Sequence, residues 1–261
     1  GSEMCIRDRV IFIERRKNMK NKIKLIRCIS VVTCMCLLQT NVYAQSINQE
    51  EKTYELLEQQ IESEHIDIIA ELDKLTNEYQ EILVIETQNK NLTEINKIKD
   101  LISGLEKIKK EYMASIQNTT RANQPNTAVA AVIGYFSNKN YKLASELLIH
   151  ATVNTNKNST YSPTNGSRVK SHSVFVKIAN GSKTNGSDIF TNTGGTASKD
   201  CYYALHSFNY SKPTSSSKLV NISDYYDYAS GDYNGMEGIA VNAMYLAQQS
   251  GAIVPYNVLI S

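Results

Sequence analysis

The stretch NGMEGIAVNAMYLAQQSGAIVPYNVLIS, residues 234–261, predicts a helix that is followed directly by a strand. Asn234 and Glu237 have the spacing of an N-cap and its capping-box partner, and Gly251 is of the type that ends a helix. Three alanines share one narrow face that could lie close on a sheet: Ala240, Ala243 and Ala247. Pro255 favours a strand start or an edge position, because proline cannot donate to a sheet ladder.

Strand signals precede this helix. The segments CYYALHSFNY (201–210) and SKLVNISDYY (217–226) are rich in tyrosine and apolar residues, and we predict both as strands. The segment SVFVKI (173–178) alternates like a strand, but the residues around it could also cap a short helix. Asn-Gly pairs predict turns with hairpins between them, and they begin at Asn165, Asn180 and Asn185.

Two short helices are predicted before these strands. The segment TAVAAVIGYFSNKNYKLASELLIHA (127–151) is broken at residues 137–140, and its second half presents Leu143 and Leu147 on one side. Residues 128–261 therefore combine helices, strands, a last helix and a last strand. This order predicts an α+β domain with a mainly antiparallel sheet.

Residues 45–118 have a different composition, rich in Glu, Lys, Ile and Leu and without proline. Apolar residues recur there every seven positions: Tyr54, Ile61, Ile68, Leu75 and Ile82. A second apolar run extends from Ile95 to Ile116 at spacings of three and four. We predict two helices, the first continuous and about 60 Å long. Because so narrow a seam cannot bury itself alone, they should form an antiparallel coiled-coil hairpin.

Charge divides the same two regions. Residues 45–118 hold 16 acidic and 8 basic side chains, whereas residues 119–261 hold 7 and 11. The acidic helices could dock on the basic domain, but a solvated helical face beside that domain is the interpretation we favour. Residues 119–127, polar and containing Pro125, are predicted as a linker.

The N-terminus consists of two segments. Back-translated with ordinary codons, residues 1–9 resemble a transposon-end adaptor used for sequencing libraries, so we interpret residues 1–18 as leftover upstream sequence from a metagenomic assembly. Residues 19–44 have the basic start, apolar run and small-residue cleavage site of a signal peptide, with cleavage expected after Ala44. The apolar run is shorter than the about 20 residues that a membrane span needs, so no stable span is expected after cleavage.

Removal of residues 1–44 changes the composition of the mature chain. This segment holds 9 of the 28 basic and 3 of the 26 acidic side chains, which leaves 19 basic and 23 acidic ones. It also holds four of the five cysteines, so Cys201 has no intramolecular disulfide partner. We therefore predict a secreted bacterial protein whose stability depends on its core.

Motifs for cofactors, metals and nucleic acid are absent from the sequence. Four histidines do not form the close pairs typical of zinc sites: His65, His150, His172 and His206. The glycine-rich segment NTGGTAS (192–198) lacks the lysine of a phosphate loop, and the basic residues are too dispersed to indicate a nucleic-acid partner. No catalytic residue, cofactor or metal ligand is predicted.

Cys201 and His206 are the one nucleophile and base candidate. On the predicted strand, side chains five positions apart face opposite sides of the sheet, so the two should not meet. Cys201 is expected to be a small core residue instead.

Residues 200–237 gather tyrosine and acidic side chains. Flat apolar rings with polar tips are typical of surfaces that bind carbohydrate or protein, although the half-buried face of a sheet carries them as well. We predict a contact surface of six residues: Tyr202, Tyr203, His206, Asp224, Tyr225 and Asp227.

The leading hypothesis is a non-enzymatic secreted binding module that a coiled coil presents or assembles into a homo-oligomer. Its partner would be a protein or a cell-envelope polymer. The alternative is a secreted hydrolase or toxin-like enzyme with its site near residues 200–237. That alternative requires two of four side chains to converge in a cleft: Asp200, His206, Asp224 and Asp227.

Overall fold

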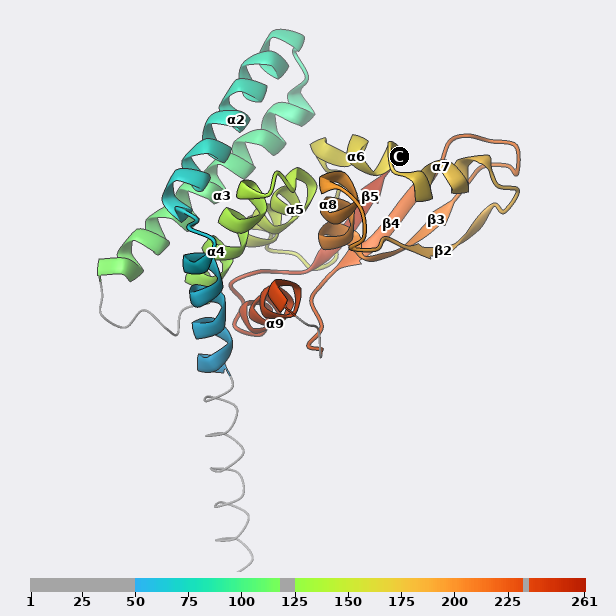
Figure 1. Ribbon diagram of the computed structural model, residues 1–261. Helices are drawn as coiled ribbons and strands as arrows, with labels where there is room; N and C mark the ends of the chain where they lie inside the picture. Colours follow the sequence, from blue (N-terminus) through green and yellow to red (C-terminus); the bar gives the residue numbers. More distant parts are fainter. Residues whose placement is uncertain (1–49, 118–124, 232–234) are drawn as a thin grey trace, which may run out of the picture. The chain divides into compact units, whose positions relative to one another are not determined.

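A computed structural model describes residues 50–117, 125–231 and 235–261, which belong to one compact unit (Figure 1). The predicted upstream segment and signal peptide, residues 1–44, lie outside the described residues, as does Asn234 of the predicted capping box. These expectations stay predictions.

The described part of the chain combines helices with a sheet, which confirms the predicted α+β class. Helical residues 50–63 are followed by α2 (Ile68–Asn89), α3 (Leu92–Gln117), α4 (Pro125–Asn138), α5 (Lys142–Val153), the 3-10 turn η2 (Thr164–Gly166), α6 (Ser167–Lys170), α7 (Ser173–Asn180), α8 (Thr196–Leu205) and α9 (Gly235–Gln249). The strands are β1 (Thr160–Tyr161), β2 (Asn185–Ile189), β3 (Ser207–Ser211), β4 (Asn221–Tyr226) and β5 (Tyr256–Ile260). The two helices predicted within 127–151 are α4 and α5, and α4 already begins inside the predicted linker.

The strands form one sheet in the order β1-β5-β4-β3-β2. β1 and β5 are parallel and the other neighbours are antiparallel, so the sheet is mixed rather than purely antiparallel. Because β5 lies between β1 and β4, Pro255 marks the start of an inner strand and not an edge. The expected Asn-Gly hairpins are wrong, since those pairs lie in η2, at the end of α7 and at the start of β2.

Residues 201–205 are helical, so the strand predicted over 201–210 is wrong in its first half. The buried residues of α8 show the reason, because they recur at the spacing typical of a helix: Asp200, Cys201, Ala204 and Leu205. The second half is β3, and the segment 217–226 contains β4 as predicted. The ambiguous segment 173–178 is helical and belongs to α7.

The first long helix is interrupted, and the prediction of one continuous helix is therefore wrong. The helical residues 50–63 end in a turn where His65 has a φ of 54°, and α2 starts after Asp67. Asp67 caps α2 by accepting a hydrogen bond from the Ala70 N–H at 3.0 Å. The seven-residue apolar repeat continues from Ile61 to Ile68 across this break, so the periodicity alone does not reveal it.

α2 and α3 run side by side and also pack on the rest of the domain (Figure 1). Both contact α4, and α3 contacts α5 as well. Gly104 permits this approach to α5, because a Cβ there would lie 2.8 Å from Cγ1 of Val153. Gly134 of α4 similarly accommodates Ile68, whose Cδ1 would lie 2.7 Å from an added Cβ. The apolar seam thus belongs to the same hydrophobic cluster as the sheet and its helices.

The acidic helices are docked on the basic domain, contrary to the solvated face that the charge pattern favoured. Lys142 of α5 pairs with Glu78 of α2 at 2.8 Å, and Lys139 pairs with Glu64. Such partly exposed pairs contribute at most about 1 kcal/mol each. Burial of the apolar seam therefore supplies most of the attachment.

α9 ends at Gln249, and Gly251 follows with a φ of 80°, so the predicted C-terminal stop is confirmed. The alanine face of α9 is buried, but the helix packs mainly against α4 and not on the sheet. The narrow face is used to bring two helices together.

Candidate ligand-binding site

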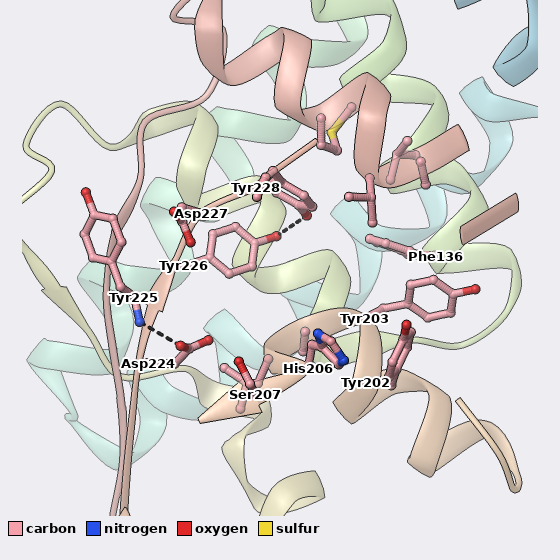
Figure 2. A pocket seen from close by; sticks show the side chains of 17 residues that line it. Phe136, Tyr202, Tyr203, His206, Ser207, Asp224, Tyr225, Tyr226, Asp227 and Tyr228 are labelled. Carbon is pink, nitrogen blue, oxygen red and sulfur yellow. Dashed lines mark hydrogen bonds between the residues drawn. The ribbon is translucent and has the colours of Figure 1, made fainter. Parts of the chain in front are cut away.

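A cavity of about 240 Å³ lies where the ends of α8 and β4 meet α4 and α9 (Figure 2). All six residues of the predicted contact surface line it: Tyr202, Tyr203, His206, Asp224, Tyr225 and Asp227. The structure therefore brings these residues to one site from two separate elements, although the exposed Tyr225 ring points away from the cavity (Figure 2).

β4 supplies the acidic wall of the cavity. Residues alternate between the two faces of a strand, and Ile222 and Tyr226 of β4 are buried. Asp224 lies between them on the same face, where it pairs in register with Val258 of β5. A carboxylate thus occupies a position at which the neighbouring side chains are core residues.

The Asp224 carboxylate is only partly compensated. Its Oδ1 accepts a hydrogen bond from the Tyr225 N–H at 2.9 Å. Burial raises the pKa of Asp224 to about 7, the Tyr225 N–H opposes this, and the negative charge of Asp227 adds to it. Burial also raises the pKa of Asp227, which follows the end of the strand. The Asp224 carboxyl group therefore changes charge near neutral pH.

Tyr226 and Tyr228 continue this wall towards α9. Their hydroxyls are 2.7 Å apart and hydrogen bonded (Figure 2). Gln248 of α9 fixes the Tyr228 backbone by accepting from its N–H at 3.0 Å and donating to its carbonyl at 3.3 Å. The strand end is held against the helix, so this part of the cavity is built on paired backbone and not on a free loop.

The opposite wall is the end of α8. His206 terminates the helix with a φ of 39°, a conformation that non-glycine residues rarely adopt. Its N–H donates to the Tyr202 carbonyl at 2.9 Å, and its own carbonyl accepts from the Phe190 N–H at 2.7 Å. The exposed His206 ring lies 5.0 Å from the Tyr202 ring. Backbone strain of this kind at a cavity is a reason to suspect function.

Aromatic packing holds Tyr203 in place behind His206. Its ring stacks on Tyr141 at 5.3 Å and lies 5.4 Å from Phe136 of α4. Burial raises the pKa of Tyr203, so its hydroxyl stays protonated at neutral pH. The wall therefore presents a fixed ring with a polar tip.

Asp200 does not belong to this site. It is fully buried, accepts from the N–H groups of Leu143 and Ala144 at 3.1 and 2.9 Å, and lies 3.3 Å from Arg168. These contacts cap the N-terminus of α5. Of the four residues in the enzymatic alternative, the other three line the cavity: His206, Asp224 and Asp227.

Cys201 is fully buried, which confirms the expected core position, although it lies on a helix and not on a strand. Burial raises the pKa of its thiol to about 12. Because the thiolate is the nucleophilic form, this cysteine is inert at neutral pH.

His172 and Ser198 form a pair that the sequence did not suggest. His172 Nε2 lies 3.1 Å from Ser198 Oγ, and its Nδ1 accepts from the Val174 N–H at 3.1 Å. An accepting Nδ1 places the proton of the neutral ring on Nε2, which then donates to the serine. Burial lowers the pKa of His172 and favours this neutral form. The ring cannot take a proton from Ser198, so the pair caps α7 rather than activating a nucleophile.

The described residues contain neither a metal-binding cluster nor a membrane-spanning helix. Among the described residues, no group of three or more His, Cys, Asp or Glu side chains could hold a metal ion. None of the described helices combines the length and the apolar character that crossing a membrane would require.

The part of the cavity that the sequence did not indicate comes from α4 and α9. Phe136 and Met244 line it, and both had the pattern of ordinary core residues. Their contribution depends on how two helices far apart in the sequence meet, which no local signal predicts.

No family model, curated protein or solved structure matches this chain.

Proposed function

We propose that this protein is a secreted bacterial binding module, and that the cavity between α8 and β4 receives a group projecting from its partner. The observation that supports the proposal most strongly is the convergence of tyrosine, histidine and aspartate side chains on one cavity. Pockets with mostly apolar and aromatic walls and a few polar groups are the default binding sites of proteins. The partner would be a protein or a cell-envelope polymer.

A binding role also fits the way the walls are made. Ring packing holds Tyr203, and backbone hydrogen bonds hold Tyr228. These side chains therefore lose little conformational freedom when a ligand binds. Preorganised groups of this kind lower the entropic cost of binding.

The test uses chain 45–261, which contains the whole compact unit. It is immobilised and presented with purified envelope polymers and secreted proteins. We expect micromolar binding of at least one, and a loss of about tenfold or more for Tyr202→Ala. Tyr245→Ala, a half-buried tyrosine of α9 outside the cavity, is the matched control. Absence of any binder, or equal losses in both variants, would refute the proposal.

We further propose that α2 and α3 serve as a coiled-coil hairpin through which the protein assembles into homo-oligomers. Val84 and Ile85 near the end of α2 and Leu92 at the start of α3 are exposed apolar side chains, which is the supporting observation. Light scattering on chain 45–261 should give a mass above that of one chain. Val84→Glu should reduce that mass, and a monomer at all concentrations would end this proposal.

The enzymatic alternative retains one supporting observation. A carboxyl group with a pKa of about 7 in a cleft has the acidity that a general acid needs. A panel of glycoside, ester and peptide substrates would test it. Turnover that Asp224→Asn abolishes would favour the hydrolase, and the absence of turnover with intact ligand binding would favour the binding module.

A further inference from the structure

The cavity has an uncompensated negative charge. Its described lining contains two carboxylates, Asp224 and Asp227, and it includes neither lysine nor arginine. The other polar side chains of the wall are those of His206, Ser207 and several tyrosines. When both carboxylates are ionised, nothing in the described lining neutralises them.

This situation differs from that of two other carboxylates in the domain, each of which has a cation nearby. Asp188 of β2 accepts a hydrogen bond from the next residue's N–H at 2.9 Å, just as Asp224 does, but Lys177 lies 3.9 Å from it. Asp200 has Arg168 at 3.3 Å. Asp224 has the same local geometry without the cation, and it faces an open space where a cation could be placed.

The rest of the wall also suits a positive charge. Figure 2 shows Tyr226 next to the Asp224 carboxylate, and Tyr202 and Tyr203 across the pocket beyond His206. Aromatic faces attract cations through the negative potential above the ring, and ammonium groups bind over tyrosine rings in this way. Tyrosine rings together with a carboxylate are therefore a suitable receptor for such a group.

We propose that the cavity binds an organic ammonium group on an aliphatic stem. The proposal rests on the proposed function, because it identifies the chemistry of the group that this cavity receives. The ammonium nitrogen pairs with Asp224 and the stem lies along the tyrosine rings. A space of about 240 Å³ admits an alkylammonium group of the length of a lysine side chain.

Binding is then linked to pH. Asp227 raises the pKa of Asp224, and the other titratable groups near this carboxylate are His206 in the same lining and the hydroxyls of Tyr226 and Tyr256 in the sheet. Asp224 must be ionised to pair with the ligand, and an alkylammonium group stays protonated up to a pH of about 10. Affinity should therefore rise about tenfold between about pH 6 and about pH 8, with proton release on binding below neutral pH.

Titration calorimetry on chain 45–261 with n-butylammonium chloride, at constant ionic strength, tests this. We expect a dissociation constant in the millimolar range at pH 8, the predicted weakening at pH 6, and much weaker binding of n-butanol, which has the same stem without charge. Asp224→Asn keeps an acceptor for the Tyr225 N–H but removes the charge, and it should weaken binding about tenfold and abolish the pH dependence. Asp188→Asn is the matched control and should change neither.

Three outcomes would overturn the ammonium proposal. These are equal binding of n-butanol and n-butylammonium, wild-type affinity in Asp224→Asn, and binding of calcium chloride without binding of n-butylammonium. Each leaves the proposed function standing if Tyr202→Ala still weakens partner binding. If neither Tyr202→Ala nor Asp224→Asn weakens partner binding, the proposed function itself is refuted.

Discussion

Asp200 and Asp224 are both acidic residues inside the domain, and their surroundings are opposite. Asp200 lies at the start of α5, where two backbone N–H groups and Arg168 surround its carboxylate. Asp224 receives a single backbone N–H and faces a cavity. Burial raises the pKa of both, to about 6 for Asp200 and to about 7 for Asp224.

The difference separates a carboxylate that organises the chain around it from one that is left without a full set of partners. A buried carboxylate that is fully hydrogen bonded organises the chain around it, and removing it leaves orphaned donors. A buried carboxylate with too few hydrogen-bond donors and no cation lowers the stability of the free protein. A bound cationic ligand would relieve that cost. A raised pKa alone would not distinguish the two cases, whereas their partners do.

The strongest form of the structural case is Glu146 of α5. It is fully buried and accepts from the Tyr161 hydroxyl at 2.7 Å, the Thr164 N–H at 2.6 Å, and the Asn165 N–H and side-chain amide at 2.8 and 2.7 Å. Glu146→Ala should lower the free energy of unfolding by about 4 kcal/mol, because all four donors lose their acceptor. Urea unfolding of chain 45–261 measures this.

The control for Glu146 is Glu106→Ala on the exposed side of α3, which should change the unfolding midpoint very little. A loss of less than about 1 kcal/mol for Glu146→Ala would show that hydrogen-bond count does not identify structural carboxylates in this domain.

Asp200→Ala should have the next largest effect, a loss of about 3 kcal/mol. The substitution removes the cap of α5 and leaves Arg168 without its carboxylate. Arg168→Ala and the double variant complete a thermodynamic cycle in urea unfolding. If the stability losses of the two single variants add up to that of the double variant, Asp200 and Arg168 do not stabilise each other, and the structural role of the pair is contradicted.

Asp224→Asn should act in the opposite direction and stabilise the free protein. A folded-state pKa of about 7 against an ordinary value of 3.8 means that the folded state holds the proton more tightly than the unfolded state. Wild-type stability therefore falls as pH rises from about 4 to about 7, and the full cost is present above pH 7. After allowance for solvent screening, the variant should gain about 2 kcal/mol at pH 8.

Unfolding of wild type and Asp224→Asn at pH 5 and pH 8 measures this gain. The difference between the two proteins should be larger at pH 8. A loss of stability in the variant at pH 8 would mean that Asp224 is structural, like Asp200.

The sequence indicated the two walls of the cavity but not the reason they meet. Tyrosine and aspartate are concentrated in residues 200–237, and this composition was sufficient to select the six wall residues. Residues 201–205 were predicted as a strand because aromatic residues prefer strands, but this preference is weak. In α8 it is outweighed by the burial of Asp200 and Cys201 at helical spacing, which composition does not reveal. Contacts such as Phe136 of α4 with Tyr203 of α8 depend on tertiary packing that no local pattern contains.

Asp188→Asn should have the smallest effect, and it is the closest control for Asp224→Asn. Asp188 shares with Asp224 a place on a strand and an acceptor bond from the following N–H, which asparagine preserves. Its partner Lys177 lies 3.9 Å away with a side chain that is 79% exposed, so the pair contributes less than about 0.5 kcal/mol. Urea unfolding should show no change at either pH 5 or pH 8. Because the local hydrogen bond is the same at the two positions, a pH-dependent gain in Asp224→Asn alone would assign the effect to burial of the Asp224 carboxylate in the cavity, where no cation balances it.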